Sequence, residues 1–302
     1  MNRRHWTLLL ALAAIWGASY LFIAIGLRDF SPGMVGFIRV ALGALVLVPV
    51  VWGTGVLDSL RGRWALVAFV ALVQVAAPFV LIGEGQEEIP SALAGILVAS
   101  APVFAAILAV MFVPDERSQG LQLVGVGAGI AGVAVLLGVD LGGSGSELLG
   151  GLAIVLASLG YAVGGLTVKR RLKEVDPIGL AAAVLALSAV MVAPLAVATA
   201  PSEMPGLGPI AALAALGAIG TGIAFGIFYR LIAEVGTGRT FIVTYLAPGF
   251  AVVYGATLLD EELTVSTFVG LGLILAGSLL AVEGRLPWQR RAVGAPGGAP
   301  VD

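Results

Sequence analysis

The sequence contains one stretch twice, and this internal repeat constrains the fold more than any other feature. Residues 101–132 and 246–277 each contain alanine-proline, an apolar run, an acidic cluster, a Val-Gly-x-Gly step and then Ala-Gly. Equivalent residues, some well outside the stretch, are 145 positions apart: Glu116/Glu261, Gly125/Gly270, Gly127/Gly272, Gly132/Gly277, Pro32/Pro177 and Pro49/Pro194. Only Pro102 and Pro248 differ from this offset, by one residue. A repeat of this length predicts a duplicated structural unit.

Composition places the two units in a membrane. Of the 302 residues, 59% are hydrophobic and only 11% are charged, whereas a soluble globular chain carries roughly 25% charged residues. Apolar runs of about 20 residues recur, each long enough to cross a hydrocarbon layer of about 30 Å. The runs are continuous and do not alternate, which excludes a β-barrel.

We expect ten membrane spans, five in each unit. They cover residues 7–27, 33–53, 64–83, 91–113, 121–139, 149–168, 178–200, 207–229, 239–259 and 266–284. Because five is odd, the two units have opposite orientations in the membrane. The predicted fold is an all-α polytopic membrane protein with ten transmembrane helices as two inverted five-helix repeats. Residues 1–145 form the first repeat, residues 146–285 form the second, and the Pro/Gly-rich residues 286–302 form a disordered cytoplasmic tail.

Basic residues predict the orientation, because cytoplasmic loops carry an excess of Lys and Arg. Of the 16 Lys and Arg residues, Arg28 alone falls outside and Arg39 falls within a span when the N-terminus is placed inside. Both termini are therefore expected in the cytoplasm of a multi-pass cell-membrane protein. The N-terminal MNRRH and its apolar run resemble a signal peptide, but span 1 has a counterpart in span 6, so we expect it to be retained.

The inverted repeat predicts a transport mechanism. Two units related by a pseudo-two-fold axis in the membrane plane can exchange conformations, which opens a central site to alternate sides. Substrate then binds near the midplane, where the units meet. Glycines four residues apart are expected to allow close helix packing rather than motion, at Gly125/Gly129, Gly160/Gly164 and Gly222/Gly226.

Several motifs in order carry a family resemblance. These are WGASY at residues 16–20, Arg39 in FIRVALG, the APVFAAILA helix that ends in DER at residue 117, and YLAPGFAVVYG…DEELT at residues 245–264. In this order the chain resembles EamA-type transporters of the drug/metabolite transporter superfamily. The resemblance implies ten helices, a central cavity, and export or exchange of small metabolites such as amino acids. Pro114-Asp115 departs from the family, which usually has a glycine before Glu116.

Polar and aromatic side chains near mid-span are candidates to line the substrate cavity. Trp16, Ser19 and Tyr20 lie halfway along span 1, and Tyr161 takes the place of Trp16 in the second unit. Their polar atoms need partners in a dry membrane, so ordinary helix packing is the alternative. Further candidates are Gln74, Pro78, Phe79, Thr221, Tyr229, Thr244, Tyr245 and Tyr254.

Arg39 is the one charge that these spans leave inside the membrane. An ionisable residue there marks a functional site by default, and its guanidinium would suit a substrate carboxylate. Alternatively, Arg39 extends to the outer surface or pairs with an acid of the cluster Glu84, Glu87 and Glu88.

Hinge and gate candidates occupy equivalent places in the two units. Pro102 and Pro248 interrupt backbone bonding in spans 4 and 9, which favours a bend in each helix. Glu116 and Glu261 fall at the turns that follow these spans, Glu116 on the cytoplasmic side and Glu261 on the outer side. We expect them to order the turns or form gate contacts, since acids suit the positive end of a helix.

Missing residue types narrow the chemistry. Every Asp and Glu lies in a loop or at a span edge, the only histidine is His5, and cysteine is absent. Without a buried carboxylate relay, we expect facilitated transport or exchange of a neutral or zwitterionic solute. We expect no enzyme activity, metal, cofactor or nucleic-acid partner. The expected partners are a small-molecule substrate and the lipid bilayer, in a monomer or homodimer.

Other functions remain open from the sequence. A multidrug exporter of lipophilic cations would favour an acidic cavity residue, which the spans lack. A membrane-embedded enzyme needs a reactive constellation, but Ser19, Ser100 and Ser158 have no base nearby in the sequence. A channel would differ from a carrier by the absence of saturable counterflow.

Overall fold

The structure, a computed structural model, describes residues 1–112, 120–140 and 145–283. These residues contain ten helices that are long and apolar enough to cross a membrane. The helices overlap the ten expected spans, and the described ranges contain no strand. The predicted all-α fold of two inverted five-helix repeats is confirmed.

Several spans consist of more than one helical segment. The first repeat comprises α1 (Arg3–Gly26), α2 (Pro32–Val51), the 3-10 helix η1 (Val56–Leu60), α3 (Trp64–Val70), the π-helix η2 (Ala71–Ala76), α4 (Ala77–Glu88), α5 (Ser91–Val98), α6 (Ala101–Phe112), α7 (Leu121–Val135) and the π-helix η4 (Leu136–Asp140). The second comprises α8 (Gly145–Arg171), α9 (Pro177–Ala198), α10 (Leu207–Gly217), the π-helix η5 (Ala218–Ile223), α11 (Ala224–Val235), α12 (Thr237–Thr240), α13 (Ile242–Leu258) and α14 (Val265–Glu283).

The starts of α2 and α9 show how the repeat is encoded locally. The Ser31 hydroxyl accepts from the Met34 backbone N–H at 3.2 Å, and the Asp176 carboxylate accepts from the Gly179 backbone N–H at 2.7 Å. Each cap is followed by a proline, which has no N–H to leave unpaired at the first helical position. The two caps are 145 positions apart, so the same device starts both helices.

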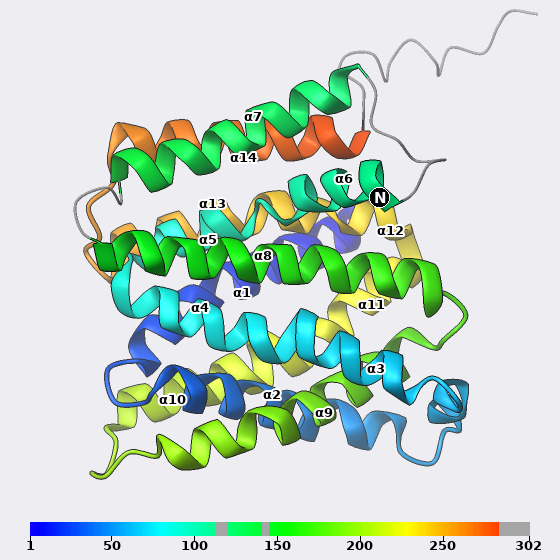
Figure 1. Cartoon of the computed structure of the whole chain (residues 1–302). Coiled ribbons are helices and arrows are strands. Elements are labelled where there is room, and N and C mark those ends of the chain that lie inside the picture. Colours follow the sequence, from blue (N-terminus) through cyan, green and yellow to red (C-terminus); the bar gives the residue numbers. More distant parts are fainter. Residues whose placement is uncertain (113–119, 141–144, 284–302) are drawn as a thin grey trace, which may run out of the picture.

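The repeats interleave instead of forming two separate bodies. Helix α2 packs on α9, and α7 packs on α14, in pairs that lie side by side in Figure 1. Helix α1 packs on α13, and its counterpart α8 packs on α5 and α6. Likewise, α4 packs on α8 and α10 packs on α1. Each of these contacts thus has an equivalent in which the two repeats swap roles. A pseudo-two-fold axis between the repeats produces this pattern.

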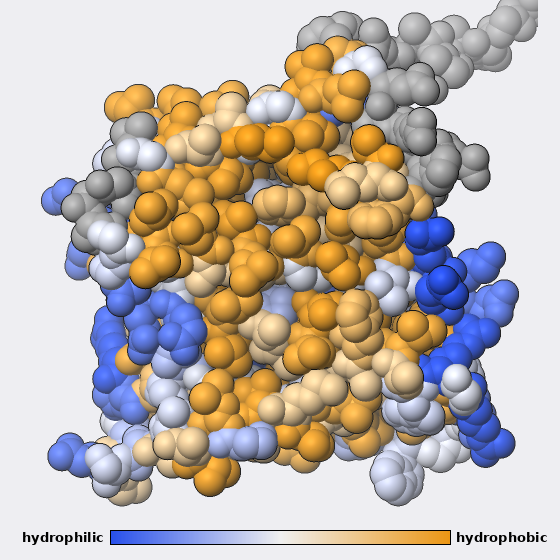
Figure 2. Space-filling model, viewed as in Figure 1, coloured by the Kyte–Doolittle hydropathy of each residue, from blue (hydrophilic) through white to orange (hydrophobic). Residues whose placement is uncertain are grey.

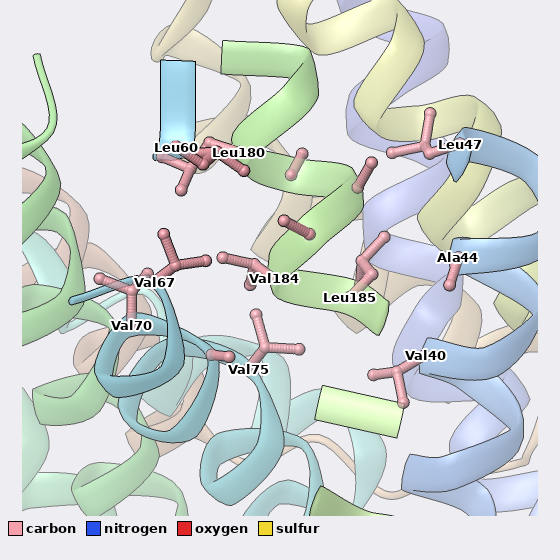
Figure 3. Packing of buried hydrophobic residues seen from close by; sticks show 14 of the residues in the cluster. Val40, Ala44, Leu47, Leu60, Val67, Val70, Val75, Leu180, Val184 and Leu185 are labelled. Atoms are coloured by element: carbon pink, nitrogen blue, oxygen red, sulfur yellow. The ribbon is translucent and has the colours of Figure 1, made fainter. Parts of the chain in front are cut away.

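A large cluster of buried apolar side chains lies where α2 and α9 pack together. Figure 3 shows Val40, Ala44 and Leu47 of α2 facing Val184 and Leu185 of α9, with the third span alongside. Lipid tails are as apolar as these side chains, so close packing rather than exclusion from water holds the helices together.

Glycines allow the closest approaches. A methyl group at Gly125 or Gly277 would strike the backbone of the opposite helix in the α7/α14 pair. Gly160 and Gly164 of α8 fit against span 3 in the same way, and Gly222 fits against Val46. The prediction of close packing is wrong for Gly226, which has nothing within 4 Å.

The surface has a broad apolar band between two polar ends. Figure 2 shows hydrophobic residues across the middle and hydrophilic residues at both sides of the view. Large apolar side chains such as Leu45, Leu149 and Val190 are exposed. We refer to the end that holds the α4–α5 and α13–α14 turns as the Glu261 end, and to the opposite end as the His5 end.

Candidate functional site

Spans 3 and 8 each contain a π-helical segment, η2 and η5, at corresponding places in the two repeats. Such segments widen a helix locally and occur often at functional sites. Thr221 lies in η5, where its hydroxyl donates to the Leu216 carbonyl 3.1 Å away. Its oxygen can still accept from another donor.

That donor is Arg39. The Nε of Arg39 donates to Thr221 Oγ1 at 3.2 Å, and the guanidinium carbon lies 3.7 Å from the centre of the Phe79 ring. Phe79 belongs to α4, directly after η2. A first-repeat arginine is therefore held between a second-repeat hydroxyl and an aromatic face, by a hydrogen bond and a cation–π contact.

Arg39 has no carboxylate partner among the described residues. In particular, it forms no ion pair with Glu84, Glu87 or Glu88, the pairing that the sequence left open. Nε is the one guanidinium nitrogen with a protein hydrogen bond in the described ranges. The other N–H donors of the fork are free for an anion.

Two tyrosines are within electrostatic range of the guanidinium. Tyr20 of α1 and Tyr161 of α8 lie close enough to interact electrostatically with Arg39, and both are half-buried. The Tyr20 ring also covers Gly95 of α5, where an added Cβ would come 3.2 Å from Tyr20 Cδ2. Phenol groups from spans 1 and 6, which are equivalent in the repeat, are thus within electrostatic range of Arg39.

Ser19 and Gln86 border this group. An added Cβ at Gly220 of η5 would come 3.3 Å from Ser19 Oγ, so Ser19 faces the π-helix that carries Thr221. The Gln86 side-chain amide donates to the Tyr20 carbonyl at 3.1 Å, and its oxygen is buried without a partner. Sequence reasoning missed Gln86, because three glutamates around it made the segment read as a span edge.

The remaining predicted cavity residues have contacts of their own. Trp16 packs on Phe225 and Phe228 of α11, with ring centres 6.5 and 5.2 Å away, and Tyr229 stacks on Phe225 at 6.1 Å. Gln74 packs against Gly164 of α8. Tyr245 lies on α13.

The two prolines that were predicted as hinges have different surroundings. In span 4 the helix breaks between α5 and α6, just before Pro102, with short-range bonds from Ala99 N to Ile96 O and from Ser100 N to Leu97 O, both 3.1 Å. In span 9 the helix α13 runs through Pro248 without interruption. The helix is thus interrupted at Pro102 and continuous at Pro248.

Three fully buried serines bind the carbonyls at the span 4 break. Ser100 Oγ donates to the Leu97 carbonyl at 2.6 Å, and Ser158 Oγ shares its hydrogen between the Leu97 and Ile154 carbonyls, at 3.2 and 3.1 Å. Ser278 Oγ donates to the Ala99 carbonyl at 3.1 Å. Ser158 comes from α8 and Ser278 from α14, so the second repeat stabilises the break in the first.

Glu261 holds the start of α5. Its two carboxylate oxygens accept from the backbone N–H groups of Ser91 at 2.7 Å and Ala92 at 2.9 Å. Gly255 makes room for the carboxylate, since an added Cβ there would overlap Glu261 Oε2. The predicted counterpart Glu116 lies outside the described residues.

A cavity of about 260 Å³ opens between α6 and α7, next to the span 4 break. Apolar side chains line it, among them Val103, Phe104, Ile107 and Ile130. Its lining does not include Arg39, and it leaves free space beside the α6 half of span 4.

An interleaved pair of inverted five-helix repeats, with an arginine held where they meet, defines a secondary membrane transporter. The sequence matches the EamA-like transporter family twice, over residues 5–138 and 148–282. The chain belongs to this family.

Curated relatives are aligned over nearly their whole length. The uncharacterized inner membrane transporter YedA of Escherichia coli (strain K12) is 29% identical over 95% of this chain and 94% of its own. A protein of the same strain named "probable amino-acid metabolite efflux pump" is 28% identical over 96% of this chain and 98% of its own. The "probable terminal-alkyne amino-acid exporter" of Streptantibioticus cattleyicolor is 24% identical over 98% of this chain and 99% of its own.

A solved crystal structure has the same fold. It superposes with a TM-score of 0.67 at 20% sequence identity, and the alignment covers 98% of this chain and all of the other. The chain is thus a multi-pass membrane transporter that works in a lipid bilayer on a small-molecule substrate.

Proposed function

We propose that this protein exports a small zwitterionic metabolite of the amino-acid type across the cell membrane, and that Arg39 holds the substrate carboxylate. The observation that carries the proposal is the state of Arg39, which is held by Thr221 and Phe79 without a carboxylate partner in the described ranges. Two relatives named for amino-acid export support the substrate class.

The physical reason is the cost of an unpaired charge. A charged side chain inside a membrane is expensive unless it is paired or hydrated. The free N–H groups of Arg39 form a planar fork that matches a carboxylate with two parallel hydrogen bonds. The phenol oxygens of Tyr20 and Tyr161 are acceptors that suit the ammonium group of the same zwitterion. A lipophilic cation would instead be repelled by the guanidinium.

The proposed orientation places both termini in the cytoplasm. Basic residues gather at the His5 end, where Arg4 and Arg230 pair with Glu234 and Arg63 pairs with Glu174. Cytoplasmic ends of membrane proteins carry this excess. The Glu261 end then faces outward.

In this orientation the described conformation is closed to the outside. Helix α13 packs on α5 at the Glu261 end, whereas α6 packs on α8 and α14. Spans 4 and 9 therefore meet at their outer halves. We interpret this arrangement as the inward-facing state of an alternating-access cycle.

Counterflow in proteoliposomes tests the substrate class and the role of Arg39. Vesicles preloaded with unlabelled amino acids should accumulate labelled amino acid in a saturable way. Arg39→Gln should abolish accumulation, and Arg39→Lys should raise KM about tenfold or more, because an ammonium cannot replace the planar fork. Arg28→Gln, the same charge change on an exposed loop residue, is the matched control.

Two results would overturn the proposal. Wild-type counterflow by Arg39→Gln would remove Arg39 from the substrate site. Failure of every amino acid, together with saturable exchange of a lipophilic cation, would replace the amino-acid class by a multidrug function.

A further inference from the structure

Helix α5 is held at both of its ends by hydrogen bonds from the second repeat. Glu261 accepts from Ser91 N and Ala92 N at its start, while Ser158 and Ser278 donate to carbonyls at its end. We propose that α5 is the outer gate of the transporter, with Glu261 as its latch and the serine-bound break as its hinge. The proposal rests on the alternating-access function proposed above.

The latch is the cap that α5 otherwise lacks. The first N–H groups of a helix have no partner within the helix, and the residue before α5 is Pro90, whose side chain makes no capping hydrogen bond. The Ser91 hydroxyl is buried and has no partner either. A carboxylate at this positive helix end is stabilised by charge as well as by two hydrogen bonds.

The turn before α14 is built to deliver that carboxylate. Asp260 has a positive φ of 54°, a conformation that costs a non-glycine residue energy unless its surroundings enforce it. The Glu261 backbone N–H donates to the Gly255 carbonyl at 3.1 Å, which fixes the next residue of the turn. The glutamate therefore reaches across from span 9 to span 4 at a defined position.

The hinge lets α5 move independently of α6. Pro102 has no N–H to donate, so the helix is already interrupted there. The Leu97 carbonyl accepts from the Ser100 backbone N–H in a short turn and also from the Ser100 hydroxyl, and the Ala99 carbonyl accepts from the Ser278 hydroxyl. When Glu261 lets go, α5 can swing away from α13 about this point and open the space above Tyr20, whose ring packs against Gly95 of α5.

Single-cysteine labelling tests the latch, because the chain has no cysteine of its own. The reporter is Val252→Cys on α13, which is 6% exposed and packs in a cluster with α5 residues. A membrane-impermeant maleimide is added from the Glu261 side of intact cells. Glu261→Ala should speed labelling about tenfold or more, the effect of losing at least one hydrogen bond to a charged group.

Matched variants separate the latch from general damage. Glu262→Gln changes an exposed neighbouring acid and should leave the rate unchanged. Gly255→Ala keeps every charge but puts a methyl group where Glu261 Oε2 lies, and it should speed labelling as Glu261→Ala does. Leu185→Cys, buried at 1% in the α2/α9 contact, reports on loosening of the whole bundle.

The outcomes decide the proposal. Faster labelling of Val252→Cys with unchanged labelling of Leu185→Cys supports a gate. Equal acceleration at both reporters, or at neither, overturns it. The assay needs no substrate, so its failure leaves the Arg39 proposal untouched, and a failed counterflow experiment leaves the latch untouched.

Discussion

Spans 4 and 9 are copies of one sequence, yet they fold differently. Both carry alanine-proline near the middle, but span 4 breaks into α5 and α6, while α13 continues through Pro248. The proline alone therefore does not decide whether the helix breaks. The difference lies in the neighbours, because the span 4 carbonyls receive hydroxyls from Ser158 and Ser278.

The residues next to span 9 that are equivalent to Ser158 and Ser278 have no side-chain hydroxyl. The residues 145 positions before Ser158 and Ser278 are Ala13 and Val133. A break exposes carbonyls that lipid cannot solvate, so it persists only where other groups bind them. The duplicated units thus share the alanine-proline sequence, but only span 4 has these hydroxyl partners, which stabilise its interrupted form. This asymmetry favours the conformation closed at the Glu261 end.

Removing the prolines one at a time should break the comparison most strongly. In Pro102→Ala the new backbone N–H can donate to the Val98 carbonyl and rejoin α5 to α6. A proline in the interior of a helix destabilises that helix by about 3 kcal/mol, and the substitution removes this cost. We expect the counterflow rate to fall more than tenfold. Pro248→Ala, in a helix that is already continuous, should change it less than twofold.

Initial counterflow rates of the two variants, at equal amounts of reconstituted protein, provide the measurement. Equal losses would mean that both prolines act in the same way and that the difference between spans 4 and 9 has no functional weight.

The fold could be predicted almost entirely from the sequence, because the constraints of a bilayer are simple. Span length and the Pro32/Pro177 pair follow from helix geometry and local capping, and both were confirmed. The asymmetric break could not be foreseen. Pro102 and Pro248 look alike in sequence, and the residues that distinguish them come from distant helices.

The site was predictable in part. Arg39 was predicted as the one intramembrane charge, and the candidate Phe79 contacts it, while the candidates Tyr20 and Tyr161 are within electrostatic range. The role of Thr221 as its hydrogen-bond partner depends on a π-helical segment, which has no sequence signal of its own. Glu261 was expected at a turn, but its partner is the start of a helix 170 positions earlier.

Removing the hinge serines should sharpen the comparison with a smaller effect. Interhelical hydrogen bonds in membrane proteins average about 0.6 kcal/mol, so Ser158→Ala with Ser278→Ala should destabilise the closed state by about 1.2 kcal/mol. That corresponds to roughly sevenfold faster outside labelling of Val252→Cys. Ser188→Ala is the control, since this equally buried serine bonds the Ala71 carbonyl away from the break. Equal labelling rates in the double variant and the control would show that the serines do not stabilise the break.

The smallest expected effect comes from placing a side-chain hydroxyl next to span 9, like those that already lie next to span 4. Ala13 is fully buried in a cluster that includes Val243 of α13. Ala13→Ser therefore places a hydroxyl beside the backbone carbonyls of span 9. When it does not reach them, it can bond the carbonyl four residues earlier, as Ser158 does with Ile154 at 3.1 Å, so it is not left unpaired. One such bond of about 0.6 kcal/mol should favour a break in span 9, and with it the opposite conformation, by about threefold.

Outside labelling of Val252→Cys should rise by that factor, with Ala13→Val as a control that adds bulk without a hydroxyl. A rise in both variants would mean that crowding, not hydrogen bonding, shifts the equilibrium, and that neighbouring hydroxyls do not decide which copy of the repeat breaks.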